Sequence, residues 1–227
     1  MDQFSKLAKK YLDKGLIAGL EWEIRHFNKV LSKNVEGFSD IENKTILEPG
    51  QIYRIYSMTK PIVSVAAIRL IEACKLSLYS NIQDLIPSFK HLKVLRPNGE
   101  LERLKRPINL ADLLTHTAGL SYNFNMGCSV AQFYQQENIL NDANISLEQI
   151  VEQIATLPLA FQPGESWRYS VATDVIGRVL EVVENKNLSE ILSEQILEPL
   201  GMKDTSFTVC EANAKKIMPM HGNTDAN

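Results

Sequence analysis

Ser57 and Lys60 are the residues whose types and spacing could do chemistry, because Ser57-Met58-Thr59-Lys60 forms an S-x-x-K motif. Side chains three residues apart share one face of a helix, so the Lys60 amine can reach the Ser57 hydroxyl. A serine hydroxyl is a weak nucleophile at neutral pH and needs a base beside it. A lysine can serve as that base where burial lowers its pKa. The pair therefore indicates nucleophilic catalysis, although a motif this short is only a hypothesis.

The element that must position this pair is a helix that begins at Ser57. Pro61 is tolerated only in the first turn of a helix, where few backbone N–H groups have partners. The free N–H groups at such a helix start favour the negative charge of a developing oxyanion. The residues that follow are so apolar that we expect the helix to be buried on nearly every side. They are Ile62, Val63, Val65, Ala66, Ala67, Ile68, Leu70 and Ile71.

The rest of the chain predicts an α+β protein. Residues 1–15 have the periodicity of an amphipathic helix. Residues 20–24 alternate between apolar and polar, as in a strand, and Phe27-Asn28-Lys29 indicates a turn into a second strand. Later segments read mainly as helices, one of them opened by a capping box at Ser146. We therefore divide the chain into an N-terminal part (1–75), a mainly helical region (76–207) and a C-terminal tail (208–227).

Composition and missing motifs exclude several classes of function. A net charge of −3 favours neither nucleic acid nor an anionic membrane as partner. The apolar run at residues 61–67 is too short to span a bilayer, and residues 1–15 lack the apolar core of a secretory signal. Three widely spaced cysteines without a CxxC pair favour reduced thiols in a cytoplasmic protein. Without HExxH, G-x-S-x-G or a nucleotide-binding loop, we expect no metal and no cofactor.

Longer segments extend the S-x-x-K motif into a family resemblance. Taken together, and in this order, they resemble the serine β-lactamase-related hydrolases, which include class C β-lactamases, D-alanyl-D-alanine peptidases of the penicillin-binding-protein type and family VIII-like esterases. The resemblance covers about residues 16–207. The segments that carry it are Tyr53–Lys60, Ile108–Leu120 with its Leu-Leu-Thr-His-Thr-Ala-Gly-Leu stretch, Pro163–Ser170, Asp174–Gly177 and Pro199–Thr205.

The resemblance implies a β-lactamase/transpeptidase-like fold, in which helices flank an antiparallel sheet and a mainly helical region adjoins it. It also implies a mechanism. Ser57 attacks an ester or amide carbonyl and forms an acyl-enzyme, and Tyr169, together with Lys60, acts as general base and then general acid. The Ser57 N–H supplies part of the oxyanion hole. Val171, Trp167 and Tyr122 are candidates for lining the substrate pocket, although aromatic side chains are more often simply packed.

Two departures from the family pattern refine this expectation. The family's second motif is Tyr-x-Asn, whereas this chain has Tyr169-Ser170-Val171. Because Val171 cannot hydrogen-bond the amide of a β-lactam or peptide, it favours an esterase. The third motif, a Lys-Thr-Gly-type strand, is not found. We therefore expect the C-terminal strands to be missing, and a completing segment or a second copy of the chain to cover the sheet edge.

Three functions stay open on these grounds. The first is an esterase acting on a small-molecule ester or amide, and the second is a β-lactamase or D-alanyl-D-alanine carboxypeptidase. The third is a catalytically silent fragment or scaffold of the same fold, which the joint presence of Ser57, Lys60 and Tyr169 disfavours. His116 lies between two threonines in what looks like a packing loop. We expect it to be structural, because no Ser-His-Asp arrangement is visible.

Overall fold

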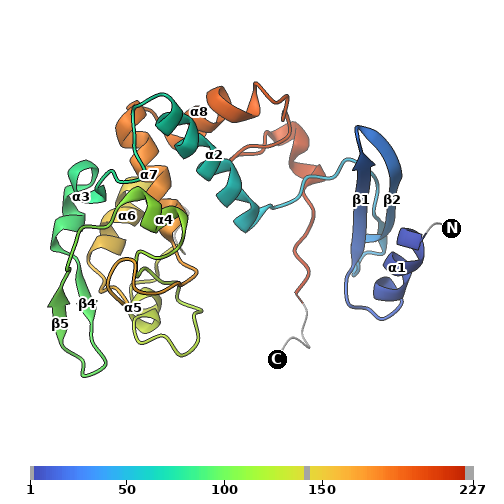
Figure 1. Cartoon of the computed structure of the whole chain (residues 1–227). Coiled ribbons are helices and arrows are strands. Elements are labelled where there is room, and N and C mark those ends of the chain that lie inside the picture. The colour runs from blue at the N-terminus through green and yellow to red at the C-terminus, as the bar shows by residue number, and fades with distance from the viewer. Residues whose placement is uncertain (1–2, 141–143, 223–227) are drawn as a thin grey trace. The chain divides into compact units, whose positions relative to one another are not determined.

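The computed structural model describes residues 3–140 and 144–222 (Figure 1). The chain forms two compact units, one made from residues 1–56 and 207–227, the other from residues 57–206. This division differs from the expected boundary near residue 75. The helix α2 (Thr59–Glu72) belongs to the second unit because it packs against the helices α7 (Ala172–Glu184) and α8 (Leu188–Leu192).

A β-hairpin dominates the first unit. The strands β1 (Gly19–His26) and β2 (Lys29–Asp40) pair antiparallel, and β2 also pairs with the short strand β3 (Thr45–Ile46) in the order β1-β2-β3. Phe27 and Asn28 both have positive φ, at 44° and 62°. A two-residue turn with this geometry matches the twist of the flanking strands. The predicted pair of strands and the turn between them are therefore confirmed.

The first unit also contains α1 (Gln3–Leu12) and the 3₁₀ helix η4 (Glu211–Lys216). The expected N-terminal helix is present, but its apolar face is not buried as a whole. Ser5 and Ala8 are buried, whereas Leu7 and Tyr11 are 53% and 46% exposed. A parallel bridge between Ile52 and Ile217 joins the two chain segments of this unit.

The second unit is mainly helical, as expected, with one small hairpin. Its elements are α2, α3 (Ile82–Leu85), η2 (Pro87–His91), β4 (Lys93–Leu95), β5 (Leu101–Arg103), α4 (Leu110–Leu114), α5 (Ala131–Gln136), α6 (Leu147–Ala155), α7, α8 and the π-helical turn η3 (Ser193–Leu197). The expectation that α2 is buried all round was wrong. Its buried residues are Val63, Ala66, Ala67 and Leu70, which form one face, whereas Val65 and Ile68 are 49% and 43% exposed.

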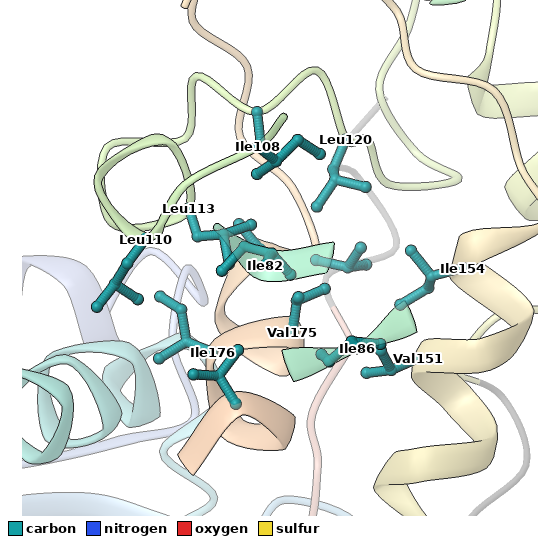
Figure 2. Close-up of a cluster of buried hydrophobic side chains, with 14 of the residues drawn as sticks. Ile82, Ile86, Ile108, Leu110, Leu113, Leu120, Val151, Ile154, Val175 and Ile176 are labelled. Carbon is teal, nitrogen blue, oxygen red and sulfur yellow. The ribbon is translucent and has the colours of Figure 1, made fainter. Parts of the chain in front are cut away.

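The core of this unit gathers around α7, which packs against α2, α3, α4, α6 and α8. Figure 2 shows the part of the core where side chains from α3, α4, α6 and α7 meet, among them Ile82, Leu113, Ile154 and Ile176. Each of these is at most 1% exposed. Full burial of one such side chain stabilises a fold by about 1.5–3 kcal/mol. The same helices therefore hold the start of α2 and the start of α7 at fixed places.

Polar side chains set the ends of these helices. Capping boxes open α4 at Asn109, α6 at Ser146 and α8 at Asn187, and the box at Ser146 confirms the sequence prediction. The helix α7 ends at Asn185, whose left-handed φ of 51° is a common helix stop. Within the part of the chain that the structure describes, no helix has the length and apolar character needed to cross a membrane.

Candidate active site

Ser57 lies in η1 (Tyr56–Met58), a single 3₁₀ turn directly before α2, and Lys60 lies in the first turn of α2. The Lys60 Nζ atom donates a hydrogen bond to Ser57 Oγ over 3.3 Å. Ser57 is exposed and Lys60 is partly buried. The structure thus brings the two residues of the S-x-x-K motif together at the start of a helix, with the hydroxyl open to an incoming carbonyl group.

Tyr169 reaches the same serine from a distant part of the chain. It lies in the loop that leads into α7, and its phenol oxygen is 2.6 Å from Ser57 Oγ. A general base must lie within about 2.6–3.2 Å of the group whose proton it removes. The Tyr169 oxygen meets this requirement, and the Lys60 amine lies just beyond it. Tyr169 is therefore the group best placed to take the Ser57 proton.

Tyr122 forms the other side of the site. Lys60 Nζ donates a hydrogen bond to the Tyr122 hydroxyl over 3.1 Å. The rings of Tyr122 and Tyr169 are 5.2 Å apart, and the Lys60 amine lies 5.5 Å and 4.7 Å from their respective centroids. Tyr122 also stacks on Phe124, at 4.8 Å. Lys60 is thus held between two tyrosines, so Tyr122 belongs to the same side-chain cluster as Ser57, Lys60 and Tyr169.

The electrostatics of this cluster separate the roles of its members. Burial alone would lower the pKa of Lys60, but hydrogen bonds to Tyr169 and Tyr122 outweigh it and raise that pKa. Burial would raise the pKa of Tyr169, but the Lys60 amine and the Ser57 hydroxyl outweigh it and lower that pKa. Burial dominates at Tyr122, whose pKa is raised. The expectation that burial lowers the pKa of Lys60 is therefore wrong, because its hydrogen bonds to the two tyrosines outweigh burial.

The loop that contains His116 packs the site's surroundings together. His116 has a positive φ of 57°, and its carbonyl accepts a hydrogen bond from Arg168 N at 2.9 Å. Its ring lies 5.2 Å from that of Tyr169, and its Nδ1 atom lies 3.2 Å from Ser170 Oγ. Burial, helped by the charge of Lys60, lowers the pKa of His116. These contacts fit the predicted structural role, since the described partners of the ring do not include Ser57.

The two other expected substrate-binding residues, Val171 and Trp167, differ in how exposed they are. Val171 is 0% exposed and belongs to the hydrophobic core, so its side chain cannot contact a substrate as we expected. The reason is that it lies at the start of α7, directly over the packed interior. Trp167 is 64% exposed, and its ring lies 6.4 Å from that of His116. It is therefore on the surface near the site and stays a prediction as a substrate contact.

Two further residues near the site carried no recognisable signal in the sequence. Asn125 donates a hydrogen bond from Nδ2 to the Tyr169 carbonyl over 2.8 Å. Asp174 lies in the first turn of α7, where burial raises the pKa of its carboxyl against the opposing charge of Lys60. Neither contact follows from local spacing, because each depends on how separate loops meet.

The same residues do not suggest a metal site. Over residues 3–140 and 144–222, no three His, Cys, Asp or Glu side chains gather closely enough to hold a metal ion. The chemistry that this geometry offers is proton transfer and nucleophilic attack by Ser57.

Comparison with known proteins agrees with this geometry. The Beta-lactamase family model matches residues 4–227. Protein Rv1367c of Mycobacterium tuberculosis is 33% identical over 94% of this chain and 53% of its own length. Esterase EstB of Burkholderia gladioli is 30% identical over 92% of this chain and 51% of its own. The chain therefore spans about half the length of the curated relatives that it matches.

Among solved structures, EstCE1, described as a hydrolase with promiscuous acyltransferase activity, superposes with a TM-score of 0.80 and 29% identity. The match covers 94% of this chain and 54% of that one. The expected β-lactamase/transpeptidase-like fold is confirmed by this and other neighbours. With a family match over nearly its whole length and a serine, a lysine and a tyrosine in mutual contact, the chain belongs to the Beta-lactamase family of serine β-lactamase-related proteins.

Proposed function

We propose that this chain carries the nucleophile of a serine hydrolase that cleaves carboxylic esters through an acyl-enzyme. The observation that carries the proposal is the position of Ser57 Oγ, 2.6 Å from the Tyr169 oxygen and 3.3 Å from Lys60 Nζ. Similarity to an esterase, EstB, supports the ester class. A hydrogen-bonded serine beside a phenolate and an ammonium is the arrangement that activates a hydroxyl for attack.

The proposed reaction has two steps. Tyr169 phenolate takes the Ser57 proton while Oγ attacks the ester carbonyl carbon, and collapse of the tetrahedral intermediate transfers that proton to the departing alcohol. Water then attacks the acyl-enzyme, Tyr169 takes a proton from the water, and the proton returns to Ser57 as the carboxylic acid leaves. Lys60 stays an ammonium throughout and stabilises the phenolate. The Ser57 N–H, at the helix start, stabilises the oxyanion.

A β-lactamase or D-alanyl-D-alanine carboxypeptidase is the second candidate, because both share this chemistry. The buried position of Val171 removes the only side chain that the sequence offered for discriminating between amide and ester substrates. The ester assignment therefore depends on similarity to EstB. A catalytically silent scaffold is the third candidate, and it predicts an unreactive Ser57.

Intact-mass spectrometry after incubation with a fluorophosphonate, and separately with a penicillin, tests the proposal. We expect one fluorophosphonate adduct, located on Ser57 by peptide mapping and lost in Ser57→Ala. Ser166→Ala is a matched control, since Ser166 is an exposed serine three residues before Tyr169. Ready labelling by penicillin at Ser57 would favour the second candidate. A chain that folds but takes up neither reagent would contradict the proposal and favour the scaffold.

A further inference from the structure

The loop between residues 121 and 128 has a hydrogen-bond pattern that the proposed mechanism does not yet use. It begins at Ser121, which is 0% exposed, and contains Tyr122, the hydrogen-bond partner of Lys60. The Ser121 N–H donates to the hydroxyl of the buried Tyr134 over 3.3 Å. One end of the loop is therefore anchored in the core, while the next residue contacts the catalytic lysine.

Asn125 connects this loop to the segment that carries Tyr169. Its Nδ2 group donates to the Tyr169 carbonyl over 2.8 Å and to Ser121 Oγ over 3.0 Å. Both donor hydrogens of the amide are therefore used, one within the loop and one toward the Tyr169 segment, at the junction where these two segments meet. A second bond, from Val171 N to the Ser121 carbonyl, spans the same junction at 3.3 Å. Because this backbone hydrogen bond is longer, the bond from Asn125 to the Tyr169 carbonyl is the stronger of the two.

These two hydrogen bonds set how Tyr122 and Tyr169 face Lys60. Tyr122 is the residue after Ser121, and Tyr169 is the residue whose carbonyl Asn125 holds. Because both backbones are joined at this point, their rings stand 5.2 Å apart with the Lys60 amine beside both. A small shift of the Tyr169 backbone would lengthen the 2.6 Å contact between its oxygen and Ser57 Oγ.

We propose that Asn125 is a positioning residue that holds the Tyr169 oxygen against Ser57 and Lys60 by binding the Tyr169 carbonyl. This inference rests on the proposed function for its effect on rate, but its structural part stands alone. Without the amide, the Tyr169 carbonyl loses its side-chain donor, and among the hydrogen bonds of the described residues the one from Val171 N to the Ser121 carbonyl still joins the two segments. Misplacement of a catalytic group by about 1 Å can cost on the order of a hundredfold in rate.

The test compares substitutions of Asn125 with substitutions of a second asparagine in the same loop, Asn123. Asn125→Ala removes both donor hydrogens, and Asn125→Asp replaces the NH2 group by a carboxylate oxygen in nearly the same shape. Asn123→Ala and Asn123→Asp are the matched controls, because Asn123 lies two residues away in the same loop and the described contacts of the site do not include its side chain. We expect both Asn125 variants to react with a fluorophosphonate at Ser57 about ten- to a hundredfold more slowly. We expect both Asn123 variants to stay within about threefold of the parent protein, since surface changes away from such contacts are mild.

A spectroscopic titration separates this inference from the proposed function. Ultraviolet absorbance of tyrosinate, with Tyr169→Phe subtracted, follows the ionisation of Tyr169 whether or not Ser57 reacts. Because the pKa of Tyr169 is lowered by Lys60 and Ser57, we expect Asn125→Ala to move its titration to higher pH, and Asn123→Ala to leave it unchanged. If the parent protein fails to label while this shift is seen, the proposed function fails and the inference stands.

Other outcomes would overturn the inference. An unchanged Tyr169 titration in a folded Asn125→Ala protein would show that the amide does not position the phenol. Slow labelling in Asn125→Asp alone, with Asn125→Ala normal, would show that added charge and not the lost donor is responsible. If Asn125→Ala does not fold, judged by near-ultraviolet circular dichroism, the same titration of Asn125→Leu decides the question, because leucine is neutral, similar in size and has no donor.

Discussion

Removal of the Tyr169 hydroxyl should abolish the activation of Ser57 while leaving the fold intact. Tyr169→Phe deletes one oxygen, which is 2.6 Å from Ser57 Oγ. The remaining ring keeps its contacts with His116 and Tyr122, each at 5.2 Å between centroids. A general base contributes about 10²–10⁴-fold in rate. At about 1.36 kcal/mol per tenfold, this corresponds to an increase of about 3–5 kcal/mol in the activation barrier.

The assay is the second-order rate constant for fluorophosphonate labelling of Ser57, measured from about pH 5 to about pH 11, a range that spans the ordinary tyrosine pKa. The base must lose its proton before it can act, so the rate of the parent protein should rise as pH passes through the pKa of Tyr169. Because that pKa lies below the ordinary tyrosine value, the rise should come at a lower pH than for an unperturbed phenol. Tyr169→Phe should label slowly and should lose this dependence.

Tyr122→Phe is the matched control. Its hydroxyl bonds to Lys60 at 3.1 Å, and its raised pKa keeps it protonated, so it cannot serve as the base. We expect its removal to slow labelling by less than about tenfold, because the hydrogen bond to Lys60 is made both before and during the reaction and its loss changes the barrier little. If Tyr122→Phe cost as much as Tyr169→Phe, or more, the assignment of Tyr169 as the base would be refuted.

Three further substitutions, one of them with a matched control, test the packing and helix capping around the site. Val171→Asn should give no gain in penicillin turnover and should lower the free energy of unfolding by about 1–3 kcal/mol, measured in urea, because it buries an unpaired amide in the core. Gly119→Ala should lower the free energy of unfolding by more than about 2 kcal/mol, since its φ is +86° and a Cβ would lie 2.4 Å from the Phe161 carbonyl oxygen. Its control is Gly99→Ala, which has a similar φ of +85° but open space around it, and which should cost only about 1 kcal/mol in thermal unfolding. Ser146→Ala removes the cap of α6 and should cost about 1 kcal/mol by the same measurement, with an unchanged rate of Ser57 labelling.

Local patterns were enough to predict several elements. The turn at Phe27-Asn28, the capping box at Ser146 and the helix after Ser57 depend on interactions between residues only a few positions apart. The same holds for the contact between Ser57 and Lys60, because three residues span nearly one helical turn. Such features are determined by backbone geometry and short-range hydrogen bonds, which the order of residue types makes visible.

Burial was less predictable than helix position. The apolar residues of α1 and α2 suggested broader burial than is found, since Leu7, Val65 and Ile68 are all exposed by more than two-fifths. Hydropathy indicates which side chains gain from leaving water, but it does not say which neighbouring elements are there to cover them. In the same way, Val171 was expected to face a substrate, although the start of α7 directs it into the core.

The residue types at positions 57, 60 and 169, together with their family pattern, determined the candidate chemistry by themselves. The proposed assignment of Tyr169 as the base depends on the tertiary structure. It rests on a 2.6 Å contact between residues 112 positions apart, and on a charge balance in which hydrogen bonds outweigh burial at Lys60. Asn125 and Tyr122 join the site for the same reason: long-range packing brings their loop against Tyr169 and Lys60, and no spacing along the chain encodes that contact.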